Sequence, residues 1–189
     1  MATVTPEFIV FTGPMFGSKT TRLLDAIDRA GYQKKRVALF KAAMDDRYSS
    51  SFVCTHSGNK VEATVVDSSA SILEYLARTE TVYDVVAVDE AFMIEGVGDV
   101  LVWLFKRGIS IFVATLSLSA SLDSFEEVVK ILPWATRVEV CSAVCTVCGA
   151  DAYFTHKKVD DGKLISVGGS DLYEPRCWHH HCVSEIDDE

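Results

Sequence analysis

The sequence predicts an α/β fold with a mostly parallel sheet that carries helices on both faces, followed by a small metal-binding domain. Short β-branched runs alternate with amphipathic stretches up to about residue 140, and such alternation implies right-handed crossovers between parallel strands. The chain has 189 residues, of which 49% are hydrophobic, so it can bury the core of one domain plus an appendage. Most of its cysteines lie near the C-terminal end. We therefore expect two domains, residues 1–140 and 141–189.

The elements of the larger domain follow in chain order. Apolar runs predict strands at 7–13, 35–43, 84–90 and 110–118. Helical periodicity predicts helices at 19–33, 72–80, 96–108 and 125–135. Gly108 and Pro133 are expected to end the third and fourth helices. In such a fold, ligands bind at the carboxyl ends of the strands.

The remaining segments connect the sheet to the smaller domain. Residues 136–144 are expected to form a strand that leads out of the core. Residues 152–169 are expected to form a hairpin, because Asp-Asp-Gly at 160–162 between two alternating segments is turn chemistry. The acidic end at 184–189 is expected to fray.

The composition excludes some classes of function. A net charge of −9 argues against broad binding to nucleic acid, which requires clustered Lys and Arg. No apolar run reaches the roughly 18 residues that a membrane helix needs, and the N-terminus lacks the features of a secretion signal. We expect a cytoplasmic protein that binds neither nucleic acid nor membranes.

The segment "GPMFGSKTT" at 13–21 is close to a phosphate-binding loop. That pattern consists of Gly, any four residues, Gly, Lys, and then Ser or Thr. Gly13, Lys19 and Thr20 match it. Ser18 stands in place of the second glycine, and Gly17 lies one position before it. Backbone N–H groups and the helix N-terminus would hold phosphates, Lys19 would reach the outer ones, and the Thr20 hydroxyl would bind magnesium. The alternative is a tight turn with a surface lysine.

Charged residues follow two other predicted strands at the same edge of the sheet. Asp89 and Glu90 end one strand, where one carboxylate could complete a magnesium shell and its neighbour could act as a base. Such a pair is also common as a helix cap. Asp45, Asp46 and Arg47 follow the second strand, and Arg47 could stabilise charge on a moving phosphoryl group or simply form a surface ion pair.

The C-terminal cysteines and histidines form two metal-binding pairs. Cys145 and Cys148 are separated by two residues, as are Cys177 and His180, which suits a closed tetrahedral zinc site. In a reducing compartment such crowding favours a metal over disulfides, although the cysteines could merely be buried. A closed site would be structural. The rivals of His180 for the fourth position are His179, His181 and Cys182.

Together these motifs resemble the zinc-containing thymidine kinases of animals, many bacteria and large DNA viruses. Five stretches occur in the family's order: "GPMFGSKTT", "DDRYSSSFVCTHSG", "VVAVDEAF", the C-x-x-C pair and "VGGSDLYEPRCWHH". The resemblance implies a P-loop core of the RecA type and a zinc-binding lasso domain. It also implies transfer of the ATP γ-phosphate to the 5′-hydroxyl of thymidine, magnesium as a cofactor, and a homotetramer.

The resemblance also assigns roles to residues. It makes Glu90 the catalytic base. The ATP and magnesium set is implied to be Gly13, Pro14, Met15, Phe16, Gly17, Ser18, Lys19, Thr20, Asp45, Asp46, Arg47, Asp89 and Phe92. The thymidine set is implied to be Met15, Ala120, Phe125, Leu164, Ile165, Ser166, Val167, Gly168 and Tyr173.

Three places depart from the family's pattern. Ser18 replaces a glycine, Phe92 replaces a usual Gln, and Ala120 stands where the family has an aromatic residue. A non-glycine residue forced into glycine geometry costs on the order of 1–3 kcal/mol, so we expect a loop that binds ATP more weakly, with Gly17 supplying rotational freedom. The alternatives are a catalytically inactive subunit with a structural or regulatory role, or a kinase for a different nucleoside.

Overall fold

The computed structural model describes residues 5–44, 52–54, 60–159 and 168–182. Its largest sheet among these residues has six strands in the order β5-β2-β6-β7-β1-β8, and every neighbouring pair is parallel. The strands are β1 (Phe8–Gly13), β2 (Val37–Ala42), β5 (Thr64–Val66), β6 (Val85–Asp89), β7 (Ser110–Leu116) and β8 (Arg137–Val140). The predicted parallel α/β sheet is therefore confirmed.

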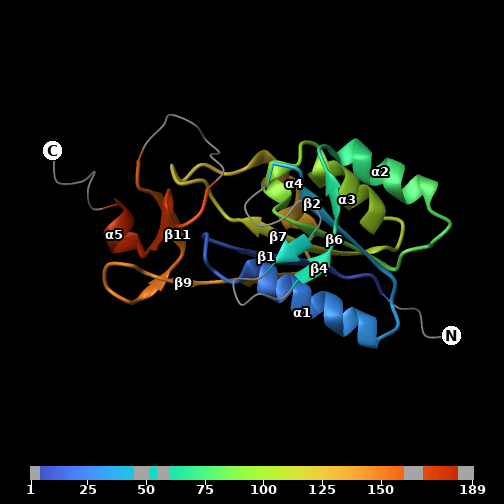
Figure 1. Cartoon of the computed structure of the whole chain (residues 1–189), viewed down its shortest axis with the longest axis horizontal. Coiled ribbons are helices and arrows are strands. Elements are labelled where there is room, and N and C mark those ends of the chain that lie inside the picture. The colour runs from blue at the N-terminus through green and yellow to red at the C-terminus, as the bar shows by residue number, and fades with distance from the viewer. Residues whose placement is uncertain (1–4, 45–51, 55–59, 160–167, 183–189) are drawn as a thin grey trace.

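Helices cover both faces of this sheet, as predicted (Figure 1). On one face lies α1 (Lys19–Tyr32), whose Leu23 packs with Ile9 and Phe11 of β1. On the other lie α2 (Ser69–Arg78), α3 (Val97–Phe105) and α4 (Glu126–Ile131), and there Phe8 of β1 belongs to the same core as Leu101. Successive residues of β1 thus point to opposite faces and both are buried, which is why the strand reads as a continuous apolar run.

Several element boundaries differ from the sequence-based expectation. Helix α2 starts at Ser69, three residues early, directly after Ser68, which has an extended backbone and makes no side-chain capping hydrogen bond. Helix α4 ends at Ile131, and Pro133 lies inside a following 3₁₀ turn, η2 (Leu132–Trp134), where it is tolerated near the start. Gly108, at φ +88°, follows α3 and has the left-handed conformation that favours glycine. In the described residues, no helix is both long and apolar enough to cross a lipid bilayer.

The expectation missed three short strands before residue 70. Edge strand β5 is three residues long and has one buried side chain, Val66, so its pattern is too short to recognise. Strands β3 (Phe52–Cys54) and β4 (Lys60–Glu62) pair with each other in antiparallel fashion. Short pairs of this kind depend on tertiary contacts more than on local pattern.

A carboxylate from α4 holds the start of α3. Glu127 accepts hydrogen bonds from the backbone N–H groups of Gly96 (3.1 Å) and Gly98 (2.6 Å). These donors belong to the first turn of a helix, where they lack intrahelical partners and where a negative charge is favoured. The contact ties α4 to the start of α3, directly after the segment that follows β6.

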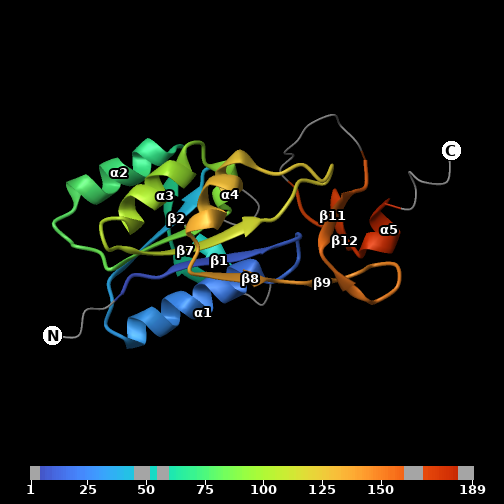
Figure 2. The same ribbon diagram turned by 180° about the vertical axis from the view of Figure 1, so that it is seen from behind.

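The chain leaves the sheet after β8 and forms a small lobe at one end of the molecule (Figure 2). Strand β9 (Ala143–Val144) pairs with β10 (Asp151–Ala152), β11 (Phe154–Lys157) pairs with β12 (Tyr173–Arg176), and α5 (Trp178–Cys182) closes the lobe. The expected strand at 136–144 is thus divided, because β8 joins the parallel sheet and β9 belongs to the lobe. The division into domains at residue 140 stays a prediction.

The expected hairpin at 152–169 is placed differently. Strand β11 does occupy its first arm, but within the described residues its partner is β12, with Thr155 opposite Pro175. Most of the expected second arm lies at 160–167, outside the described residues. Local turn chemistry indicates where a chain can reverse, whereas the lobe as a whole decides which strands pair.

Candidate active site and metal centre

The loop from Gly13 to Ser18 joins the carboxyl end of β1 to the start of α1. Phe16 and Ser18 both adopt left-handed backbone conformations, at φ 66° and 59°. Ser18 is the N-cap of α1, and its side chain makes no capping hydrogen bond. A glycine would adopt this conformation at no steric cost, whereas a side chain costs roughly 1–2 kcal/mol. The exchange of glycine for Ser18 therefore does place a side chain in glycine geometry.

The structure shows a steric requirement at Gly17, while the expected rotational freedom stays a prediction. Gly17 has no positive φ, so it does not supply left-handed freedom. Its constraint is space: a Cβ at Gly17 would lie 2.7 Å from the carbonyl oxygen of Cys141, and one at Gly13 would lie 2.2 Å from the same oxygen. Both glycines are required because the loop passes directly against the backbone that leaves β8.

This geometry separates two exchanges that look similar in the sequence. We expect Ser18→Gly to raise the free energy of unfolding by about 1 kcal/mol, because it removes left-handed strain. We expect Gly17→Ser to lower it, because the new Cβ collides with the Cys141 carbonyl. Urea unfolding of both variants checks the pair. A Ser18→Gly variant less stable than the natural protein would contradict the left-handed conformation of Ser18.

Two polar residues of the loop motif are held in place at the start of α1. Lys19 is 7% exposed, and its Nζ donates a hydrogen bond to the carbonyl oxygen of Pro14 at 2.7 Å. The Thr20 hydroxyl donates to the Asp89 carboxylate, with Oγ1 3.1 Å from Oδ1 and 3.4 Å from Oδ2. Asp89 is itself buried at the end of β6. The structure therefore brings the loop and the first predicted carboxylate together.

Glu90 follows Asp89 at the same edge of the sheet. It has a left-handed backbone, φ 52° and ψ 45°, and is the N-cap of the 3₁₀ turn η1 (Ala91–Met93). Its side chain is half-buried. A non-glycine residue in this conformation costs of order 1–3 kcal/mol and persists only where its surroundings impose it. Backbone strain of this kind clusters at functional sites, and here it lies at the carboxyl ends of the parallel strands.

An apolar cluster lies beside these carboxylates. Phe92 packs against Phe125 with ring centroids 4.7 Å apart, and the cluster also includes Leu116, Val128, Met15 and Met93. The structure thus gathers Met15 and Phe125, two residues of the implied thymidine set, in one place. Phe92, which the resemblance put in the nucleotide set, also belongs to this apolar cluster, and its role in nucleotide binding stays a prediction.

The other described residues of the implied thymidine set do not belong to this cluster. Ala120 is half-buried in a turn organised by Ser119, whose hydroxyl oxygen accepts hydrogen bonds from the N–H groups of Ser121 and Asp123. Tyr173 is buried at the start of β12, and Gly168 faces Leu172, whose Cδ1 would lie 2.4 Å from an added Cβ. Seven candidates lie outside the described residues: Asp45, Asp46, Arg47, Leu164, Ile165, Ser166 and Val167.

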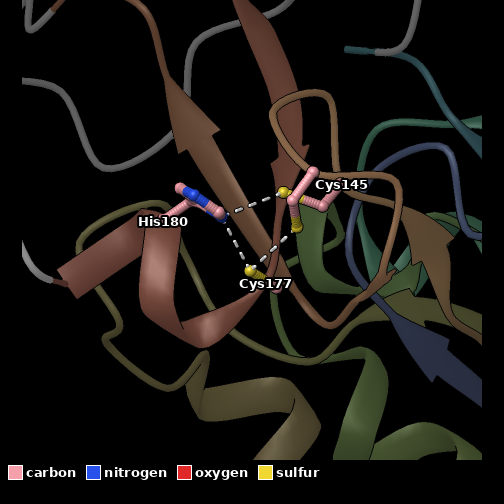
Figure 3. Close-up of side chains that lie close together, drawn as sticks. Cys145, Cys177 and His180 are labelled. Atoms are coloured by element: carbon pink, nitrogen blue, oxygen red, sulfur yellow. Dashed lines mark hydrogen bonds between the residues drawn. The ribbon is translucent and has the colours of Figure 1, made fainter.

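Cys145, Cys148, Cys177 and His180 form a compact cluster in the lobe, with all four ligand atoms within 4.8 Å of one another. His180 Nδ1 lies 3.1 Å from Cys177 Sγ and 3.7 Å from Cys145 Sγ (Figure 3). Cys148 Sγ lies 3.8 Å from Cys177 Sγ. A tetrahedral zinc ion with sulfur ligands at about 2.3 Å separates them by about 3.8 Å, so the cluster fits zinc.

The surroundings of Cys145 favour its thiolate form. Burial raises the pKa of the Cys145 thiol, but hydrogen bonds from the backbone of Cys177, Cys148 and Val147 outweigh it and lower the pKa to about 6. Thiolate is the form that binds metal. At Cys148 a hydrogen bond from the backbone of Ala150 lowers the pKa, but burial and the side chains of Cys145 and Cys177 outweigh it and raise the pKa of that thiol. Among the rival histidines, His181 has its Nε2 3.1 Å from the Thr155 carbonyl oxygen, and His179 is exposed.

Two residues at the loop were missed from the sequence. Cys141 presents its carbonyl oxygen to Gly13 and Gly17, and the Thr155 hydroxyl accepts a hydrogen bond from the Met15 N–H at 3.0 Å. Both lie more than a hundred residues away from the loop along the chain. No local pattern could have indicated these contacts.

Known proteins match this chain over most of its length. A family model described as thymidine kinase matches residues 7–181. A thymidine kinase of Thermococcus kodakarensis is 35% identical over 185 residues, which cover 93% of this chain and 94% of that protein. A thymidine kinase of Bacteroides thetaiotaomicron is 36% identical over 169 residues, covering 89% of this chain and 83% of that protein.

Proposed function

Because this chain belongs to the thymidine kinase family, we propose that it transfers the γ-phosphate of ATP to the 5′-hydroxyl of thymidine. The observation that carries the proposal is the contact between the loop and the β6 carboxylate, Thr20 Oγ1 to Asp89 Oδ1 at 3.1 Å. It joins a phosphate-binding segment to a metal-binding carboxylate at the carboxyl edge of a parallel sheet, where ligands of such folds bind.

The loop supplies the positive environment for the phosphates. Backbone N–H groups from Gly13 to Ser18 and the N-terminus of α1 would receive the β- and γ-phosphates. Lys19 already has its ammonium group inside the loop, on the Pro14 carbonyl, from which it could turn to a phosphate oxygen. The left-handed Ser18 supports an affinity for ATP below that of a loop with glycine there.

Thr20 and Asp89 would hold the magnesium ion. Magnesium binds oxygen ligands at about 2.1 Å in an octahedron, so neighbouring ligand atoms lie about 3.0 Å apart. The hydroxyl and carboxylate oxygens are already 3.1 Å apart, so they suit adjacent ligand positions. The ion would neutralise charge that develops on the transferred phosphoryl group.

Glu90 would be the general base. It is adjacent to the magnesium carboxylate, it is half-buried rather than fully solvated, and its strained backbone fixes where the side chain begins. The carboxylate would take the proton of the 5′-hydroxyl as that oxygen attacks the γ-phosphorus, and the ADP oxygen leaves on the opposite side.

The thymine base would bind against the apolar cluster. Met15, Phe125 and Phe92 offer a thioether and two aromatic rings, and Phe92 lies two residues after Glu90 along the chain. A flat base would gain stacking and burial there. Tyr173 and the segment 164–168 would close the pocket from the lobe. The Phe92–Phe125 packing favours altered specificity as the second candidate, because it fills space beside the carboxylates with rings.

The lobe would carry one structural zinc ion on Cys145, Cys148, Cys177 and His180. Four protein ligands leave no position for substrate, so zinc would stabilise a lobe whose own core is small. We further propose a cytoplasmic homotetramer, since the family resemblance implies that assembly.

A phosphorylation assay with labelled ATP over a panel of nucleosides tests the proposal. We expect a 5′-monophosphate product with thymidine, dependent on magnesium. Product with another nucleoside alone would support altered specificity. Magnesium-ATP that binds in calorimetry without any product would support an inactive subunit, and the absence of ATP binding would overturn the kinase proposal.

A further inference from the structure

The lobe that carries the metal cluster contacts the phosphate loop directly, at two consecutive residues. The Phe16 side chain packs against the buried cluster of Ala143, Cys145 and Ala152, together with Cys177. The Met15 N–H donates to the Thr155 hydroxyl. Both contacts cross from the sheet to the lobe, so the loop is fixed from outside as well as by β1 and α1.

The Phe16 contact reaches the metal ligands themselves. Cys145 belongs both to the apolar cluster on which Phe16 packs and to the four-residue metal cluster, and Cys177, another member of the metal cluster, packs on the same apolar cluster. Phe16 has a left-handed backbone, at φ 66°, which a bulky residue adopts only where the surroundings impose it. The half-buried ring packs on the lobe, and this contact favours the strained conformation.

The Thr155 contact is connected to the same cluster by a second route. Thr155 is 3% exposed, its hydroxyl receives the Met15 N–H at 3.0 Å, and its carbonyl oxygen lies 3.1 Å from His181 Nε2. His181 adjoins the metal ligand His180 in α5. The position of Thr155 therefore depends on the helix that the metal anchors.

We propose that Phe16 and Thr155 are positioning residues that transmit the order of the metal centre to the phosphate loop, so that zinc occupancy sets nucleotide affinity. The metal would organise Cys145, Cys177 and α5. Cys145 and Cys177 position the apolar cluster on which Phe16 packs, and α5 positions Thr155. The contacts of Phe16 and Thr155 then hold the backbone of residues 15 and 16. The nucleotide part of this inference rests on the proposed function. The inference that the lobe orders the loop does not rest on the proposed function.

The experiment compares matched variants by two readouts. Phe16→Ala removes the ring and Thr155→Val removes the hydroxyl at nearly constant size. Tyr153→Ala and Thr146→Val are the controls, since Tyr153 is exposed and the Thr146 hydroxyl binds Glu174 at the surface of the lobe. Thr155→Ser keeps the hydroxyl and is expected to restore natural behaviour.

The first readout is amide hydrogen exchange of residues 13–20. We expect faster exchange there in Phe16→Ala and Thr155→Val, with near-natural zinc content and natural exchange in α3. The second readout is calorimetric titration of magnesium-ATP, where loss of one anchor should raise Kd about tenfold, the size of one hydrogen bond to a part-buried donor. Zinc-depleted protein should show the same faster exchange and the same weaker ATP binding. Adding Thr155→Val to zinc-depleted protein should change these readouts little further, because zinc depletion and the substitution both act through the contact between Thr155 and the loop.

The outcomes separate the two proposals. Unchanged loop exchange in Phe16→Ala and Thr155→Val would overturn the coupling, whether or not ATP binds. Zinc-depleted protein with natural loop exchange and natural ATP affinity would overturn it as well. If the two variants and zinc depletion all speed amide exchange of residues 13–20 in a protein that binds no ATP, the coupling is supported and only the kinase proposal is overturned.

Discussion

Glu90→Gln is expected to reduce turnover by about 10²–10⁴-fold while the affinity for magnesium-ATP stays nearly unchanged. The amide has the shape of the carboxylate but cannot take the proton of the nucleophile. A base acts in the reaction step and contributes little to binding of the nucleotide, so the loss should appear in kcat. Steady-state kinetics with thymidine and calorimetry with magnesium-ATP measure the two quantities separately.

The matched control is Glu95→Gln, which makes the same exchange at an exposed residue five positions later. It is expected to keep natural turnover. Asp89→Asn provides the contrast, since loss of the carboxylate that contacts Thr20 should weaken magnesium-dependent ATP binding as well as turnover. Natural turnover in Glu90→Gln would move the role of base to another group.

The sheet and its helices could be predicted from the sequence because burial leaves a periodic pattern. The central strand β7 is buried along its full length, and such a run between amphipathic helices is typical of a parallel sheet. The prediction missed β5, whose three residues carry almost no pattern, and it started α2 at its first large apolar residue instead of after Ser68. The start of α2 follows the change of backbone conformation at Ser68, which apolar periodicity does not show.

The site could be predicted only where its parts are close along the chain. The loop, the Asp89–Glu90 pair and the two metal-binding pairs each lie within a few residues and have recognisable spacing. The contacts of Thr155 with Met15 and of Cys141 with Gly17 join distant segments, so they follow from the folded backbone alone. The same holds for the left-handed backbone of Glu90, which its side-chain type does not encode.

The metal centre yields the other large expected effect. We expect about one zinc per chain in protein purified without added zinc, and near-complete loss of zinc in the Cys145→Ser, Cys148→Ser double variant, because a hydroxyl is a poor zinc ligand in place of thiolate. Structural zinc contributes about 10–16 kcal/mol in small zinc peptides, so the lobe should also lose its cooperative unfolding transition. Metal analysis and thermal unfolding measure the two effects.

Single histidine variants then identify the fourth ligand, since three histidines are consecutive in α5. His180→Ala should weaken zinc retention against a competing chelator, because His180 Nδ1 lies 3.1 Å from Cys177 Sγ. His179→Ala should retain zinc as the natural protein does, since His179 is exposed and outside the cluster. His181→Ala should also retain zinc, but it removes the side chain beside the Thr155 carbonyl and should loosen the phosphate loop. Unchanged zinc in the double cysteine variant would rule out this centre, because no closed site can survive the loss of half its ligands.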